Sequence, residues 1–342
     1  WLAVIIAFVV EDFAGYWMHR LNHRVNIFWN RHIIHHSSED FNLSCALRQS
    51  ISNTIKFSAI FMIPAALLGV PPSIFAVLGP LHLFMQFWYH TQLIGKLGLL
   101  EYILVTPSHH RVHHAINPEY IDKNYSQILI IWDKLFGTFQ PEIDSVKPVY
   151  GTLKPMKTWN PVIINFKHLW HLIKDAWHAK RIVDKIRIWF MPTGWRPKDL
   201  EKKFPLEIIN DPKKQIKYET KNSSILIGWS WVQLVITNIL MFHFFISLST
   251  FNSTLDYLYA FILILNIFSF TSLLDQRRYS IISESIKLIL VCSLFYYQNF
   301  SWYGLEGLFA YAVGIYFITS FFLHIFFQNE KNTKQTIAKT AV

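Results

Sequence analysis

The sequence predicts an all-α, polytopic membrane protein with a two-metal histidine site in a helical domain on the cytosolic side. Of its 342 residues 52% are hydrophobic and only 16% are charged, whereas about a quarter of a soluble domain is charged. Several apolar runs reach the roughly 20 residues that a helix needs to cross a bilayer. The 16 histidines gather in short motifs, while two distant cysteines, Cys45 and Cys292, provide neither a disulfide framework nor a thiolate metal site.

Seven apolar segments are candidate membrane spans. They are residues 1–18, 51–69, 73–94, 225–248, 255–274, 279–298 and 303–327. Prolines at 71 and 72 separate the second segment from the third, and because proline interrupts a helix, we expect a helical hairpin there. Glu284 and Lys287 interrupt the sixth segment.

The basic residues predict which side of the membrane each loop faces. Of the 32 Lys and Arg, 21 lie between Lys96 and Lys221, and the turns at 69–73, 249–254 and 298–303 contain none. Basic loops face the cytosol, so the histidine motifs are expected there, at a bacterial cytoplasmic membrane or the endoplasmic reticulum. The same distribution explains the net charge of +10 without nucleic-acid binding.

Composition divides the chain into three expected parts. Residues 1–150 hold the histidine motifs and form the catalytic domain, 151–222 form a cytosolic amphipathic and linking segment, and 223–342 form C-terminal transmembrane helices with a short tail. Within the middle part, residues 159–190 have the spacing of one amphipathic helix with tryptophans on its apolar side. Such a helix lies at the membrane–water interface or packs on the catalytic domain.

Three histidine motifs form the candidate metal site: one HxxxH and two HxxHH. Their members are His19, His23, His32, His35, His36, His110, His113 and His114. Residues i and i+4 share one face of a helix, so two imidazoles of each motif point to one place. The third member of HxxHH is displaced toward a neighbouring site. Eight imidazoles suffice for two metal ions with positions left for oxygen or substrate, and imidazole suits iron, zinc and copper alike.

His90 is a ninth candidate ligand, because it shares a helical stripe with His82 and Gln86 and is the member nearest the motifs. His110 is preferred over His109 because only His110 completes an HxxHH motif. The other histidines are expected to be structural or interfacial: His82, His168, His171, His178, His243 and His324.

Three carboxylates are candidates for hydrogen bonds that orient ligand imidazoles. Asp12 precedes His19 by seven residues and shares its helix face, and an acid within a membrane span is usually functional. Glu39 and Asp40 follow His36 directly, with a helix cap as the alternative role.

The sequences around these motifs resemble the fatty acid hydroxylase/sterol desaturase superfamily. Residues 12–23, 32–36 and 110–114 are similar to its histidine boxes. The runs HHSSEDFNLSCALRQS from His35 and QFWYHT within residues 82–91 are similar to alkylglycerol monooxygenase-like members. The resemblance of the boxes covers about residues 8–140, and little is recognised beyond residue 150.

The resemblance implies a membrane di-iron oxygenase that hydroxylates a lipid substrate with dioxygen, and glyceryl ether cleavage is one such reaction. It implies two iron ions, which zinc can replace in isolated protein, and tetrahydrobiopterin as a candidate reductant, although the electron donor is not identifiable from the sequence. Arg24 departs from the pattern of the animal enzymes, in which an acidic residue is expected.

The alternatives are a lipid or sterol desaturase of the same superfamily and, from another class, a non-catalytic metal- or lipid-binding membrane protein. A divalent-metal transporter is disfavoured, because the motifs lie at the ends of spans and not at the membrane midplane.

Overall fold

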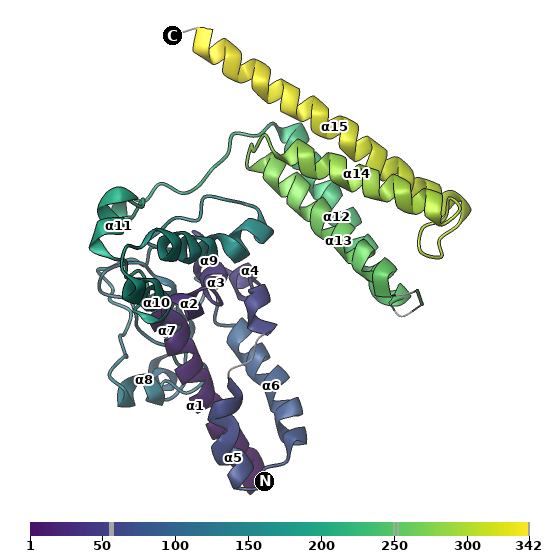
Figure 1. Cartoon of the computed structure of the whole chain (residues 1–342). Helices are drawn as coiled ribbons and strands as arrows, with labels where there is room; N and C mark the ends of the chain where they lie inside the picture. The colour runs from purple at the N-terminus through teal and green to yellow at the C-terminus, as the bar shows by residue number, and fades with distance from the viewer. Residues whose placement is uncertain (55–57, 249, 252, 341–342) are drawn as a thin grey trace. The chain divides into compact units, whose positions relative to one another are not determined.

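The computed structural model describes residues 1–54, 58–248, 250–251 and 253–340, and in these ranges it contains helices and isolated bridges but no β-strand (Figure 1). This confirms the all-α prediction. The chain forms two compact units, one of residues 1–156 and 165–217 and the other of residues 157–164 and 218–342. The predicted three-part division stays a prediction, and most of its middle part belongs to the unit that carries the histidine motifs.

Five helices in the described part of the chain are long and apolar enough to cross a membrane. They are α1 (Leu2–Arg24), α12 (Ser224–Ser247), α13 (Ser253–Leu274), α14 (Ser280–Tyr297) and α15 (Gly307–Thr340), the last through its Gly307–Glu330 portion. They correspond to five of the seven predicted spans, so a multi-pass membrane protein is confirmed in outline. The side on which each loop lies stays a prediction.

The predicted hairpin of two full spans, 51–69 and 73–94, is wrong in detail. Residues 51–69 form only short pieces, with 55–57 lying outside the described residues: η1 (Ile51–Thr54), η2 (Ser58–Met62) and α5 (Ile63–Leu67). The returning helix α6 (Pro72–Phe87) has 16 residues, fewer than a bilayer requires. Pro64 and Pro72 stand in the first turns of α5 and α6, where proline fits a helix, and α6 runs on through Pro80 to Phe87.

The pieces of this hairpin lie along α1, as Figure 1 also shows. Ala7 of α1 packs with Ala65, Val70 and Leu78 in a small apolar core. The C-terminal end of α1 is thereby held beside the short elements that carry the other histidine motifs. The motifs lie on α3 (Ile33–His36) and α7 (Pro107–His114), and the same part of the chain also contains α2 (Asn26–Trp29), α4 (Leu43–Ala46), η3 (Gly98–Tyr102) and α8 (Ile131–Leu135).

The predicted single helix over 159–190 is two helices, α9 (Pro161–His178) and α10 (Ile182–Phe190). The break occurs because Arg181 has an extended backbone, with φ −93° and ψ 132°. One side of α9 buries Leu172 against Ile188 of α10 and Leu200, which lies in α11 (Lys198–Lys203). The other side leaves Trp170 and Trp177 exposed by 55% and 79%. Ile27 of α2 also packs against these residues, so packing of α9 on the part of the chain that carries the histidine motifs is seen, and contact of the exposed face with the membrane interface stays a prediction. A last short turn, η4 (Pro212–Lys214), follows α11.

The second unit is a bundle of α12 to α15, in which α13 contacts each of the other three helices. Glu284 and Lys287, which interrupt the sixth predicted span, form a fully buried ion pair of 2.8 Å between Lys287 Nζ and Glu284 Oε1. Lys287 Nζ also donates to Asn266 Oδ1 at 2.7 Å, and Ser320 Oγ donates to Glu284 at 2.7 Å. The span tolerates these charges because each has polar partners inside the bundle.

Candidate metal centre

Nine imidazoles from distant parts of the sequence converge in two groups. The five-histidine cluster consists of His19, His23, His32, His36 and His113, and the four-histidine cluster consists of His35, His90, His110 and His114. Within each group the candidate ligand atoms all lie within 4.8 Å of one another. The clusters are neighbours, because the rings of His36 and His114 stack at 4.2 Å between centroids.

The helical spacing explains how each HxxHH motif divides between the clusters. His32 caps α3, and His36, four residues later, joins it in the five-histidine cluster while His35 turns to the other cluster. On α7 the relation is reversed, with His110 and His114 in the four-histidine cluster and His113 in the five-histidine cluster. This is the division that residues i, i+3 and i+4 of a helical turn favour.

His90 reaches the four-histidine cluster by a different route from the predicted helical stripe. Helix α6 ends at Phe87, so His90 lies beyond it in a turn. Its Nδ1 lies 2.9 Å from the carbonyl oxygen of Gln86, and its Nε2 lies 2.8 Å from His110 Nε2. His82 remains on α6 with its ring edge-on to Phe8, and His109 packs on Phe139. Neither belongs to a cluster.

Backbone carbonyl groups orient four of the nine rings. The Nδ1···O distances are 2.7 Å from His19 to Tyr125, 3.1 Å from His35 to Cys45, 2.9 Å from His90 to Gln86 and 3.0 Å from His113 to Lys123. A carbonyl oxygen only accepts, so in each case the ring donates through Nδ1–H. The Nε2 atom of each ring is then left with a lone pair.

These lone pairs face one another, and this tests whether the residues fit a metal. His35 and His90 both donate through Nδ1, yet their Nε2 atoms lie only 3.2 Å apart. His23 Nε2 is buried and has no hydrogen-bond partner within the described ranges. Converging lone pairs on rings held by carbonyls are the arrangement that a bound cation requires. The donor set therefore fits two adjacent transition-metal ions.

Burial keeps these imidazoles uncharged. Six rings have their pKa values lowered by burial to well below 6.5: His32, His35, His36, His110, His113 and His114. Burial lowers the pKa of His90 to about 4. Because a metal ligand must be neutral imidazole, the rings are ready to bind at neutral pH.

Two of the three carboxylates predicted to orient imidazoles, Asp12 and Asp40, have other partners. Asp12 is fully buried, and its oxygens accept from the backbone N–H groups of Ile128 and Leu129, each at 3.0 Å, and from Trp132 Nε1 at 2.9 Å. Asp40 forms an ion pair with Lys217 on the surface, and Glu39 lies beside Gly151. The nearby helix α4 is capped by Asn42, so the alternative of a cap by Glu39 or Asp40 does not apply there.

The 122–133 loop presents two of the orienting carbonyls, those of Lys123 and Tyr125. Asp133 fixes its shape by accepting from the N–H groups of Tyr125 and Ser126, each at 2.8 Å. Asp122 and Asn124 adopt positive φ angles of 60° and 55°, which Asp and Asn tolerate better than most residues. No sequence motif predicts these two carbonyls, because they belong to the backbone, which is the same at every residue.

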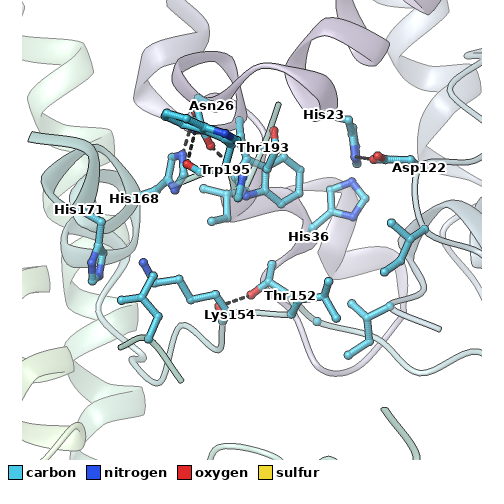
Figure 2. Close-up of a pocket in the computed structure, with 18 of the residues that line it drawn as sticks. His23, Asn26, His36, Asp122, Thr152, Lys154, His168, His171, Thr193 and Trp195 are labelled. Carbon is cyan, nitrogen blue, oxygen red and sulfur yellow. Dashed lines mark hydrogen bonds and ion pairs between the residues drawn. The ribbon is translucent and has the colours of Figure 1, made fainter. Parts of the chain in front are cut away.

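A cavity of about 240 Å³ lies beside the five-histidine cluster (Figure 2). His23, His36, His113 and His114 line it on one side. Lys154, His168 and His171 also line it, so the last two, expected to be interfacial, face the interior of the histidine-bearing unit. The remaining walls include apolar side chains: Trp29, Ile33, Ile116, Leu153, Leu172, Trp195 and Leu206.

Comparison with known proteins assigns the histidine-bearing region to a family. Residues 4–138 match the fatty acid hydroxylase family. Alkylglycerol monooxygenase from Homo sapiens is 40% identical over 289 residues, and the one from Danio rerio is 41% identical over 301. Each alignment covers 84% of this chain and 64% of the relative. The ornithine lipid hydroxylase OlsE from Rhizobium tropici is 33% identical over 136 residues, covering 40% of this chain and 41% of that protein. No solved structure matches significantly.

The chain thus spans less than two thirds of the length of these alkylglycerol monooxygenases. The family match includes the region in which all nine imidazoles converge. Residues 4–138 therefore match the fatty acid hydroxylase family, and the chain is similar to alkylglycerol monooxygenases over 84% of its length.

Proposed function

We propose that this chain is a non-haem di-iron monooxygenase that hydroxylates a membrane lipid, and that glyceryl ethers are its first candidate substrates. The observation that carries the proposal is the convergence of nine histidines in two adjacent clusters beside a cavity. The substrate class is taken from the relatives named alkylglycerol monooxygenase.

Two iron ions bound at the clusters would supply the activation of dioxygen. The protein's own part is to hold neutral imidazoles with Nε2 inward, by the Nδ1–H bonds to backbone carbonyls. Apolar side chains such as Trp29, Ile33 and Leu172 line the cavity beside them, where they can contact an apolar substrate. Imidazole alone does not select iron, so the choice of iron rests on the family and on the need for oxygen chemistry.

In the proposed reaction, one atom of dioxygen enters a C–H bond of the carbon next to the ether oxygen. The other atom is reduced to water by two electrons and two protons from a donor. The hydroxylated product is a hemiacetal, which breaks its C–O bond to give an aldehyde and the glycerol alcohol. The donor is a two-electron reductant, for which tetrahydrobiopterin is the candidate by resemblance.

The test is oxygen uptake and product analysis with iron-reconstituted protein in lipid nanodiscs, a glyceryl ether, ¹⁸O₂ and tetrahydrobiopterin or another two-electron donor. Hydroxylation puts ¹⁸O in the aldehyde, provided that trapping precedes exchange with water. Desaturation, the alternative within the superfamily, removes two hydrogens without adding oxygen. Absence of lipid oxidation with every donor, in protein that retains its metal, would instead favour a non-catalytic metal- or lipid-binding protein.

The proposed location is an integral membrane protein with the histidine clusters on the cytosolic side. The support is the concentration of basic residues between Lys96 and Lys221. Labelling of a cysteine introduced at exposed Lys180 in intact cells tests it, since a cytosolic site is protected from a membrane-impermeant reagent until the cells are opened.

A further inference from the structure

The cavity beside the five-histidine cluster has two chemically different ends. Figure 2 shows His23 and His36 on one side and Lys154 with His171 on the other. The first end belongs to the candidate metal centre. The second end has no role in holding metal, and its polar groups therefore need another explanation.

Most charges around the cavity are already paired. Arg196 binds Asp175 through two hydrogen bonds, of 2.6 and 2.7 Å. Asp122 accepts from Arg24 at 2.7 Å. Both carboxylates on the cavity wall are therefore already bound to an arginine, and the effect of Asp175 on the Lys154 pKa is opposed by that of Arg196.

Lys154 is the exception among the described residues of the cavity wall, because its ammonium makes no hydrogen bond or ion pair with them. Burial lowers its pKa to about 8, so it stays mostly protonated at neutral pH but is poorly solvated. Burial also lowers the pKa values of His168 and His171 to about 4, which leaves both rings uncharged. The cavity wall therefore carries one uncompensated positive charge, and an unpaired, desolvated cation favours an anionic ligand.

A second polar group on the same wall also lacks a partner. Thr193 Oγ1 is buried without a hydrogen bond to any described residue, and Thr193 lines the cavity. His168 donates from Nε2 to the carbonyl oxygen of Asn26 at 2.8 Å, so its Nδ1 is left with a lone pair that can accept from a ligand hydroxyl.

The size of the cavity indicates which part of a ligand it holds. Its volume of about 240 Å³ corresponds to roughly eight waters at about 30 Å³ each. This accommodates a polar headgroup with a few carbons but not a long alkyl chain, which must extend beyond the cavity.

The separation of the two ends suits such a headgroup. Ala115, directly after His114, forms an isolated bridge with Tyr150, and Lys154 lies four residues further along. An extended chain advances about 3.3 Å per residue, so the backbone of Lys154 is at most on the order of 13 Å from this bridge. A headgroup held by Lys154 therefore leaves the first carbons of its chain near the imidazoles.

We propose that Lys154 binds the anionic headgroup, a phosphate or carboxylate, of the lipid whose adjacent carbons face His36 and His113. The identity of the ligand as a lipid rests on the proposed oxygenase function. Lys154 thereby makes anionic glyceryl ethers better ligands than uncharged ones.

The test is binding of two short probes to the full chain in an uncharged detergent, followed by calorimetry: 1-O-hexylglycerol and its 3-phosphate. We expect wild-type protein to bind the phosphate about tenfold or more tightly than the uncharged ether, as charged hydrogen bonds imply. Lys154→Met and Lys154→Gln reduce the preference to about twofold or less, and Lys154→Arg retains it. Lys180→Met, which removes an exposed cation elsewhere, leaves the preference unchanged.

A wild-type protein without preference, or a preference that survives in folded Lys154→Met and Lys154→Gln, would overturn the inference. Inorganic phosphate at equal concentration should not displace the phosphorylated ether. If it does, the site takes a free anion and the lipid assignment is wrong. Because binding needs no turnover, a Lys154-dependent preference without any lipid oxidation would refute the oxygenase and keep the anionic headgroup site. Lipid oxidation by a protein that does not prefer the phosphorylated ether would support the oxygenase and refute the anionic headgroup site.

Discussion

Asp12 provides a sharp test of how the metal centre is supported, because the structure gives it a role other than the predicted one. Its carboxylate accepts three hydrogen bonds, from Ile128, Leu129 and Trp132, while fully buried. Asp12→Ala removes all three and leaves two backbone N–H groups and an indole N–H without their acceptor. Hydrogen bonds to charged groups contribute about 1.5–3 kcal/mol each, and an orphaned buried donor costs about 1–3 kcal/mol.

These contributions are not additive, so we expect Asp12→Ala to lower the free energy of unfolding by about 3–5 kcal/mol. For a protein of this size, with an unfolding entropy of about 2.1 cal/mol/K per residue, that corresponds to a fall of about 4–7 °C in melting temperature. The assay is thermal unfolding in detergent, followed by tryptophan fluorescence. Glu11→Ala is the matched control, because Glu11 Oε2 is buried without a hydrogen-bond partner among the described residues. Equal melting temperatures for the two variants would refute the reasoning.

Three further predictions concern other parts of the chain. Lys287→Met leaves Glu284 buried without the lysine, and should lower the stability of the C-terminal bundle in a thermal melt by about 3–5 kcal/mol. The double variant with Glu284→Leu should recover most of this loss. Equal melting temperatures for the single and the double variant would contradict this. His168 has its pKa lowered to about 4, so below pH 6.5 the unfolded chain binds a proton that the folded chain does not, and stability falls as pH falls from about 6.5 to 4. His168→Gln should reduce the slope of this pH dependence of the melting temperature by the share of one proton, because the other buried imidazoles with lowered pKa values remain. Trp177 is exposed by 79%, and its fluorescence is the difference in emission between wild type and Trp177→Phe. If α9 lies at the membrane interface, lipids brominated near their headgroups should quench this fluorescence. A difference in emission that brominated lipid does not reduce would contradict that placement.

The histidine motifs were predictable because they depend on local geometry. The spacing of His19 and His23 survives folding, since α1 is one continuous helix through both. The division of the HxxHH motifs between two clusters likewise follows from one helical turn. His90 was included for a reason that the structure corrects, because α6 stops at Phe87 and a turn, not a helical stripe, brings the ring inward.

Features that depend on distant contacts could not be predicted in this way. The partners of Asp12 lie more than a hundred residues away, on backbone N–H groups that have no sequence signature. The backbone carbonyl of Tyr125 that orients His19 likewise has no sequence signature. His171 has the spacing of an amphipathic helix, and only the fold of the histidine-bearing unit makes it face a cavity. The hairpin was overestimated because hydropathy does not show where a helix ends: α5 covers only Ile63–Leu67, and α6 stops at Phe87 although the apolar run continues.

If the two histidine clusters bind two metal ions, the metal content of the purified protein should show it. The measurement is elemental analysis of iron-reconstituted, detergent-purified protein beside His110→Ala, His35→Ala and His109→Ala. His109 is the matched control, because it is buried next to His110 but belongs to neither cluster. We expect about two irons per chain in wild type and in His109→Ala, and a clear loss of bound iron in His110→Ala and His35→Ala. Wild-type protein that binds no metal after reconstitution, or equal metal in His110→Ala and His109→Ala, would contradict this expectation.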